Sequence, residues 1–550
     1  MYKLPMINQH MKKLLIAVLS VLLTGNAVYS QAKKTKTRPN IVLILTDDMG
    51  YSDLGCFGSE INTPNLDTMA TGGVKMTNFY NASRCCPSRA SLLTGVYPHQ
   101  AGVGDMMNTR PYPAYQGYLN RQTVTLAEVL QQAGYGTYMS GKWHVGQAKE
   151  NWPLQRGFDR YYGLIDGANS YFGNRPYRPK QKLTIALDNE AIVPPAEYYS
   201  TDGYTDYALQ FIDQHVKKRN NDPFFMYIAY QAPHWPLHAL PEDIAKYKGK
   251  YMEGWEVVRQ KRFDKQMKLK LFPSGTTLPA LDDNIRQWAD CSWEEKVRWD
   301  EQMAVYAAMV DRVDQNVGKI KRRLQEIGEL ENTIFIFLSD NGASNETITN
   351  AGFTPEILAA NEFPASHPQS FTAYGSEGAL VSNTPFRKYK HWEFEGGNAT
   401  SFIAYGPQFI QKGMRIESPA HLVDIMPTII EYARATYPKT YKGNSIQTME
   451  GISLVSSWTA NEKAKERAIC FEHEGNKAVR NGKWKIVAEY PQNEWFLYDL
   501  SSDRAEQTDL KSKHPTVLKE MVGIYDKWAE RVGVIPYEQL DTKRTNERYK

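Results

Sequence analysis

The sequence predicts an α/β fold with a large, mostly parallel sheet flanked by helices, followed by a smaller C-terminal α+β subdomain. Three observations predict it. Short apolar runs alternate with longer helical patterns, four of these runs end in polar side chains, and the pattern changes after residue 458. The 550 residues are 42% hydrophobic and 23% charged, which is an ordinary globular composition. The chain is long for one core, so we expect two domains, over residues 38–458 and 459–550.

The parallel sheet is predicted from four apolar runs, each followed by turn signals, as is typical of buried strands. Helical patterns lie between the runs, and this alternation indicates helices on both faces of the sheet. In chain order, the strands are expected at residues 40–45, 137–140, 224–230 and 333–338, and the helices at 124–133, 204–217 and 293–327.

Two long stretches, 240–281 and 343–383, show no clear period and are expected to be irregular loops that are functional or mobile. In the C-terminal part, residues 478–487 predict two strands around an Asn-Gly turn. A third strand is expected at 494–500 and a terminal helix at 516–532. This subdomain should therefore contain a small antiparallel sheet.

The first thirty residues are predicted to be a secretory signal peptide. A basic start at 11–13 precedes an apolar run over 14–23, and Val28 and Ser30 are small residues before the cleavage point. The apolar run is too short to span a bilayer, which takes about twenty residues. The alternative is a buried N-terminal helix. We expect an exported protein, periplasmic or secreted, without a membrane span.

Charge and cysteine content exclude several classes. The chain has 65 basic and 61 acidic residues, and the leader holds three lysines and no acid, so the formal charge falls from +4 to +1 on cleavage. No long basic run is present, and we do not expect a nucleic-acid partner. Five cysteines are too few for a disulfide-dense scaffold, and an odd number leaves at least one without an intramolecular partner.

Charged, imidazole and amide side chains follow all four predicted strands. Ligands bind at the carboxyl ends of the strands in open α/β sheets, so these side chains are expected to form one site. Loops are generally polar, so each strand end alone is weak evidence. In chain order, the residues are Asp47 and Asp48, Lys142 and His144, His234, and Asp340 and Asn341.

Three carboxylates and one amide among these residues suit a hard cation, Ca²⁺ or Mg²⁺. Adjacent acids such as Asp47 and Asp48 are costly to ionise without a cation nearby. The alternative is that each pair forms a helix cap or a turn.

The most informative segment is 85–95, in which Cys85, Pro87 and Arg89 form the pattern Cys-x-Pro-x-Arg and a Leu-Thr-Gly follows. It resembles the signature of the type I, formylglycine-dependent sulfatases, in which the cysteine is oxidised to Cα-formylglycine. The register identifies this residue as Cys85, because Cys86 lies only one position before the proline. The alternative is a pair of ordinary thiols at a helix start. Pro87 suits a first helical turn, whose N–H groups would favour an anion beside residue 85.

Further motifs extend the resemblance over nearly the whole mature chain. Gly-Lys-Trp-His contains Lys142 and His144, Ala-Pro-His-Trp-Pro contains His234, and Lys390 lies five residues before Glu-Gly-Gly. Alone, each would more often be a surface lysine or a core histidine. Two departures are Asn398 after Glu-Gly-Gly and Arg504 where a proline is common, in what we expect to be a distal loop.

The resemblance implies an alkaline-phosphatase-like fold and a defined chemistry. A hydrated formylglycine carries two hydroxyls: one attacks sulfur to give a covalent sulfate ester, and the other expels sulfate by reforming the aldehyde. The metal, usually calcium in this family, would polarise the sulfate oxygens and hold the diol. Its implied ligands are Asp47, Asp48, Asp340, Asn341 and the oxidised Cys85.

The resemblance also implies catalytic roles. Asp340 would help to deprotonate the attacking hydroxyl, and His144 would take the proton of the second hydroxyl. Arg89 and Lys142 would hold the formylglycine oxygens. His234 and Lys390 would bind sulfate and protonate the leaving group.

The sequence thus predicts an exported sulfatase that hydrolyses O-sulfate esters, either aryl sulfates or sulfated carbohydrates. Its partners would be a sulfated small molecule or glycan and a formylglycine-generating, sulfatase-maturing enzyme. One alternative is a phosphonate monoester or phosphodiester hydrolase of the same superfamily, and another is a non-catalytic glycan-binding protein if Cys85 is not oxidised. Trp235, Trp255 and Tyr374 could stack on sugar rings or anchor loops.

Overall fold

The computed structural model describes residues 1–2, 38–219, 222–282, 285–349 and 352–540. Apart from Met1 and Tyr2, the leader predicted over residues 1–30 lies outside the described residues. The described part from Arg38 onward belongs to one unit, which contains both the large sheet and the C-terminal sheet. No helix of the described residues is long and apolar enough to cross a membrane.

The centre of the large sheet consists of the four predicted strands, and this confirms the predicted fold class. They lie side by side and parallel in the order β8–β1–β7–β3, so their carboxyl ends share one edge of the sheet. The strands are β8 (Thr333–Ser339), β1 (Asn40–Asp47), β7 (Phe224–Pro233) and β3 (Gly136–Gly141).

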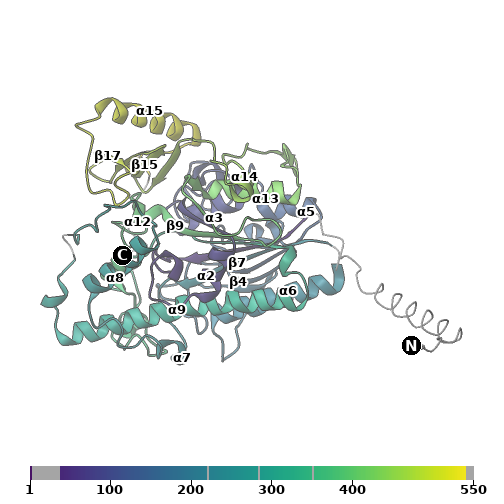
Figure 1. The fold of residues 1–550 in the computed structure, drawn as a ribbon, viewed down its shortest axis with the longest axis horizontal. Helices are drawn as coiled ribbons and strands as arrows, with labels where there is room; N and C mark the ends of the chain where they lie inside the picture. The colour runs from purple at the N-terminus through teal and green to yellow at the C-terminus, as the bar shows by residue number, and fades with distance from the viewer. Residues whose placement is uncertain (3–37, 220–221, 283–284, 350–351, 541–550) are drawn as a thin grey trace. The chain divides into compact units, whose positions relative to one another are not determined.

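Helices cover both faces of this sheet (Figure 1). Alternate residues of β1 enter different cores: Val42 and Ile44 contribute to one and Leu43 to the other. This two-sided burial explains the continuous apolar runs in the sequence. The core with Val42 includes residues of α6 (Ser200–Arg219) and α9 (Trp293–Glu326), and the core with Leu43 includes residues of α3 (Cys85–Thr94), α5 (Leu126–Gln132) and α13 (Ile425–Ala433).

The longest of these helices, α9, begins at a reciprocal cap. The Ser292 hydroxyl accepts the backbone N–H of Glu295 at 3.2 Å, and the Glu295 carboxylate accepts the backbone N–H of Ser292 at 2.8 Å. Two backbone donors of the first turn are thereby satisfied, which fixes the start of the helix at the residue where the apolar periodicity begins.

Strands that the sequence analysis did not identify extend the sheet on both sides. These strands are short or partly polar. One of them, β9, pairs antiparallel with both of its neighbours, β2 and β8. The sequence pattern of a buried parallel strand, an apolar run followed by a turn, therefore does not mark them. The strands are β2 (Val74–Tyr80), β9 (Ala399–Tyr405), β10 (Met414–Ile416) and β11 (Ala420–His421) beside β8, and β4 (Arg160–Leu164), β5 (Ile185–Leu187) and β6 (Glu190–Ile192) beside β3.

The two stretches expected to be irregular contain helices, so that expectation was wrong in part. In α8 (Trp255–Lys268) the inward face includes Arg262, which is buried and forms ion pairs with Asp53 at 2.7 Å and Glu60 at 2.8 Å. A charged residue on the inner face removes the apolar period that would have marked the helix. The other helices are α7 (Pro241–Ile244), α10 (Pro355–Ala360) and α11 (Gly375–Ser382).

The predicted C-terminal antiparallel sheet is present, and one helix, α15 (Pro515–Val532), covers it (Figure 1). The predicted turn joins β15 to β16 at Asn481 and Gly482, where the positive φ of Gly482 (57°) suits glycine. The strands are β14 (Ile469–His473), β15 (Asn476–Asn481), β16 (Trp484–Ala488) and β17 (Trp495–Asp499).

Arg504, one of the two departures from the family pattern, lies in the loop that follows β17 and is buried there. Its guanidinium is buried and donates to Glu395 Oε2 at 2.7 Å and to the Thr77 carbonyl at 2.8 Å. Lys485 of β16 also reaches Glu395, at 2.9 Å. Glu395 begins α12 (Glu395–Asn398), so these contacts tie the C-terminal sheet to the segment that carries Lys390.

We expect Arg504→Ala to destabilise the protein by about 3 kcal/mol, because one partner of a buried ion pair is lost. The midpoint of thermal unfolding measures the effect. The control is Lys511→Ala, which breaks an ion pair with Glu494, a residue whose side chain is 61% exposed, and should cost at most about 0.5 kcal/mol. Equal shifts of the two midpoints would contradict a structural role for the buried arginine.

Candidate active site

A cleft of about 460 Å³ opens at the carboxyl edge of the sheet, where the sequence predicted the site. Cys85, His144, His234 and Lys390 line it. A separate cavity of about 200 Å³ lies between α8, α9 and α11, and the residues that line it include none of the predicted catalytic or metal-binding residues.

Cys85 lies at the N-terminus of α3 and faces the cleft, whereas its neighbour Cys86 is fully buried and does not line it. The N-cap residue, Arg84, provides no side-chain acceptor for the first-turn N–H groups. These donors and the helix dipole favour an anion at this end of the helix. The position agrees with the register argument that selected Cys85.

The two adjacent thiols differ in their electrostatics. A hydrogen bond with Cys86 and the nearby Lys142 and His144 hold the pKa of Cys85 well below its usual value, although burial opposes this. Burial raises the pKa of Cys86. Burial also lowers the pKa of His144 to about 4, so its ring is neutral near pH 7 and can accept a proton.

Beneath the cleft, two cations are buried against two carboxylates. Lys142 Nζ forms a short ion pair with Asp47, and Arg89 lies 2.7 Å from Asp340 and 3.4 Å from Asp47. All four side chains have no exposed surface. Burial of these ions is tolerated only because each faces an opposite charge.

The two carboxyls titrate in opposite directions. Burial and the adjacent charge of Asp47 raise the pKa of Asp340 well above its usual value. For Asp47, burial is outweighed by Lys142, His234 and Arg89, which lower the pKa. Asp340 is therefore the better proton acceptor of the pair and Asp47 the fixed anion.

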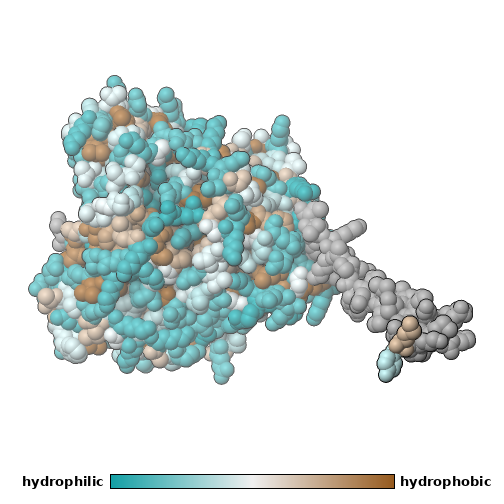
Figure 2. Space-filling model, viewed as in Figure 1, coloured by the Kyte–Doolittle hydropathy of each residue, from teal (hydrophilic) through white to brown (hydrophobic). Residues whose placement is uncertain are grey.

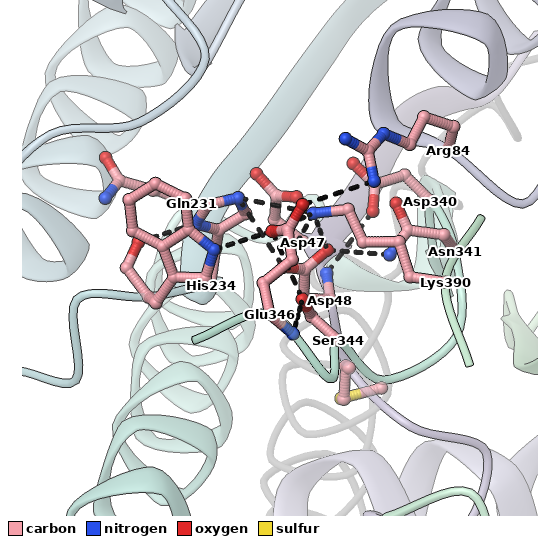
Figure 3. A network of polar contacts seen from close by, with 12 residues as sticks. Asp47, Asp48, Arg84, Gln231, His234, Asp340, Asn341, Ser344, Glu346 and Lys390 are labelled. Atoms are coloured by element: carbon pink, nitrogen blue, oxygen red, sulfur yellow. Dashed lines mark hydrogen bonds and ion pairs between the residues drawn. The ribbon is translucent and has the colours of Figure 1, made fainter. Parts of the chain in front are cut away.

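Asp48 and Asn341 complete the oxygen-rich group (Figure 3). The Asn341 amide donates to Asp48 Oδ1 at 2.7 Å, and the backbone N–H of Asp48 donates to Asp340 Oδ1 at 3.3 Å. Within the described residues, Asp47 Oδ1 and Asn341 Oδ1 are buried without a hydrogen-bond partner. Buried acceptors normally have partners, and these two oxygens fit a divalent cation bound among the four residues.

Lys390 and His234 both approach Asp48 (Figure 3). Lys390 Nζ lies 2.9 Å from Asp48 Oδ1 and 3.5 Å from His234 Nε2. His234 Nε2 lies 3.5 Å from Asp48 Oδ2. Both side chains line the cleft, where they can contact a bound anion.

Glu346 is a site residue that the sequence analysis missed. Its carboxylate lies 3.2 Å from Lys390 Nζ, 3.2 Å from Arg84 and 2.7 Å from the Trp235 indole N–H (Figure 3). Although burial opposes it, Lys390 and Arg84 hold the pKa of Glu346 well below its usual range. Glu346 lies in the stretch expected to be irregular, and no motif marks it; Arg84 could have been found as the residue before Cys85.

Only one of the three aromatic residues proposed to stack on sugars lines the cleft. Trp235 lies beside His234 and packs against Tyr177. Trp255 packs edge-on against other tryptophans, and Tyr374 stacks on a tyrosine of α9. Both residues lie outside the cleft lining and border the separate cavity between α8, α9 and α11.

The cysteines do not pair with one another. All five belong to the described residues, and each is a buried free thiol.

Comparisons with known proteins agree with this geometry. Residues 39–435 match the family model described as Sulfatase. The chain is 34% identical to an uncharacterized sulfatase of Schizosaccharomyces pombe, with 92% of this chain and 96% of the relative covered. It is 33% identical to an arylsulfatase of Klebsiella aerogenes, with 80% and 96% covered.

Among solved structures, Ps i-CgsB in complex with k-i-k-neocarrahexaose is similar, with a TM-score of 0.67 and 25% identity over 93% of this chain and 97% of that chain. The fold is thus the alkaline-phosphatase-like fold of sulfatases. Because the family model covers most of the chain and the site lies within it, this chain belongs to the sulfatase family and is a sulfuric ester hydrolase.

Proposed function

We propose that the protein hydrolyses O-sulfate esters of sulfated carbohydrates, with Cys85 oxidised to Cα-formylglycine as the nucleophile. The observation that carries the proposal is the position of Cys85: it faces the cleft at a helix N-terminus, and Lys142 and His144 lie close enough to lower its pKa. Cys86, one residue away, lacks this access.

A hydrated aldehyde at residue 85 would supply two hydroxyls, one for attack and one for release. Arg89 and Lys142, fixed by Asp340 and Asp47, would hold its oxygens. Asp340, whose pKa is raised by burial, would accept the proton of the attacking hydroxyl at its carboxylate. His144, whose ring is neutral near pH 7, would accept the proton of the other hydroxyl.

The sulfate would lie between residue 85 and the Lys390–His234 pair. This pair would bind the sulfate oxygens and donate a proton to the leaving oxygen. Asp47, Asp48, Asp340 and Asn341, with residue 85, would hold Ca²⁺ or Mg²⁺. When bound, the cation supplies Lewis-acid stabilisation of the sulfate oxygens.

The outer cleft can hold a sugar. Its lining beyond the catalytic groups combines amide and charged side chains with apolar ones such as Met106 and Met107, and Trp235 is available for one apolar sugar face. The relative Ps i-CgsB was solved with a neocarrahexaose, which supports a saccharide substrate. The polar lining residues are Asn108, Gln147, Asp166, Arg178 and Gln181.

The test is a substrate panel of sulfated mono- and oligosaccharides, an aryl sulfate, and matched phosphate and phosphonate monoesters. The highest kcat/KM should fall on a sulfated saccharide. Equal or greater efficiency on the phosphorus esters would overturn the sulfatase assignment of this cleft. Binding of sulfated glycans without turnover, in protein whose residue 85 is an unoxidised thiol, would support the non-catalytic alternative.

We further propose that a signal peptide directs export and that a sulfatase-maturing enzyme oxidises Cys85. The support is the leader pattern in the sequence and the cysteine motif. N-terminal sequencing of protein from the periplasm or medium of the native host should begin at Gln31. An intact leader on the active enzyme would contradict export by this route.

Glu346 is expected to position Lys390. Glu346→Gln should lower kcat/KM by roughly 10- to 100-fold, which corresponds to about 1.5–3 kcal/mol for a hydrogen bond to a charged group. Steady-state kinetics on the best substrate measures it, with Glu356→Gln, an exposed position on α10, as the control. Identical kinetics for both variants would show that Lys390 does not depend on this contact.

A further inference from the structure

A second group of possible metal ligands lies on the wall of the cleft, outside the constellation described above. It consists of His391, His473 and Glu474. His391 follows Lys390, while His473 ends β14 and Glu474 lies in the turn between β14 and β15. Glu474 lines the cleft. The group therefore joins the C-terminal sheet to the catalytic part.

The distances within this group match a metal site. All three ligand atoms lie within 4.8 Å of one another. His391 Nδ1 lies 2.9 Å from Glu474 Oε2, and His473 Nε2 lies 3.9 Å from the same oxygen. Ligands of a tetrahedral Zn²⁺, each about 2.0–2.1 Å from the ion, are roughly 3.3 Å apart. The two observed distances lie on either side of this value.

His473 gives an independent indication of a ligand. Its side chain has no exposed surface, and within the described residues neither ring nitrogen has a hydrogen-bond partner. A buried imidazole without partners is costly, and such exceptions call for an unseen ion or ligand.

The other two ligands are also oriented for binding. His391 Nδ1 lies 2.9 Å from Glu474 Oε2, and Asn476 Nδ2 lies 3.2 Å from Nε2 on the other side of the ring. Glu474 Oε2 lies within 3.9 Å of one ring nitrogen of each histidine, so its carboxylate can share an ion with both.

Glu474 occupies a turn position that does not favour glutamate. Its φ is 48°, and Gly475 follows with φ 86°, as in a two-residue hairpin turn that prefers Asn-Gly. His391 also has a positive φ, 88°, and its backbone N–H donates to the Ser83 carbonyl at 2.8 Å. Glu474 and His391 thus both have unfavourable backbone conformations, and their side chains lie beside each other.

We propose that His391, His473 and Glu474 bind one divalent transition-metal ion of the Zn²⁺ type. Two imidazoles and one carboxylate favour such an ion over Ca²⁺, which prefers oxygen ligands only. Three protein ligands would leave one position of a tetrahedral ion open, and Glu474 lines the cleft. This site is separate from the oxygen-rich group at Asp47 and Asp48.

The experiment is a Zn²⁺ titration by calorimetry, with tetrahedral Co²⁺ absorption as a second readout. The protein is kept in saturating Ca²⁺ to fill the oxygen-rich site. The parent and all variants carry Cys86→Ala. This substitution disrupts another possible metal-binding group, formed by Cys85, Cys86 and His144. The parent should bind one equivalent of Zn²⁺ and give the tetrahedral Co²⁺ spectrum.

His473→Gln and Glu474→Gln should each weaken Zn²⁺ binding by about 100-fold or more. His514→Gln, at an exposed histidine, should change nothing. If circular dichroism shows that the His473 variant does not fold, the test rests on Glu474→Gln. The Glu474 side chain is partly exposed, so this substitution should leave the fold intact. No Zn²⁺ binding by the parent, or equal binding by the parent and the Glu474 variant, would overturn the proposal.

Discussion

Cys85→Ala should eliminate turnover, while Cys86→Ala should leave it within a few-fold of the parent. Alanine at residue 85 removes the proposed nucleophile, and Cys85 is the only cysteine among the described residues that line the cleft. Loss of a nucleophile typically lowers kcat on the order of 10⁴-fold or more. Cys86 is buried and does not line the cleft, although its Sγ lies 3.3 Å from His144 Nε2. Its loss therefore removes a contact of His144 but no reacting group.

The two variants form a matched pair, because they differ by one position and each removes one thiol. Initial rates on the best substrate of the panel, with unfolding midpoints recorded in parallel, separate chemistry from stability. A normal rate from Cys85→Ala, or a collapse confined to Cys86→Ala, would contradict the assignment of residue 85.

Removal of the divalent cation should also eliminate turnover and lower the unfolding midpoint. Asp47, Asp48 and Asp340 lie together, and two buried oxygens of this group have no hydrogen-bond partner in the described residues. Without a cation these carboxylates repel one another, and the sulfate oxygens lose the strongest charge available to polarise them.

The test is exhaustive chelation followed by titration with Ca²⁺ and, separately, Mg²⁺. Activity and the unfolding midpoint should recover together. The ion that restores both at the lower concentration is the one that the site binds more tightly. Asp47→Asn should need far more cation, whereas Asp264→Asn, at an exposed position of α8, should behave as the parent. Full activity after chelation would contradict a metal-dependent site.

The parts of the fold that could be predicted are those in which burial dictates residue type. Strands β1, β3, β7 and β8 are covered on both faces, so they appear as apolar runs. Helix α8 could not be predicted, since Arg262 on its inner face is neutralised by carboxylates distant in the sequence. Such tertiary pairing leaves no local pattern.

The same distinction applies to the site. The residues at the strand ends and in the cysteine motif could be predicted, and the structure brings them to one edge of the sheet. Glu346 and Glu474 come from a loop and a turn without a motif, and only the folded chain places them beside Lys390 and His391. Their identification required the tertiary structure.

The central claim is tested most directly by the mass of the tryptic peptide spanning residues 85–89, from protein made in its native host. Replacement of the thiol by an aldehyde at Cys85 should make this peptide about 18 Da lighter than the sequence mass, as the proposed nucleophile requires. Fragmentation should locate the change at residue 85 and leave Cys86 intact. An unmodified Cys85 in fully active enzyme would contradict the formylglycine mechanism.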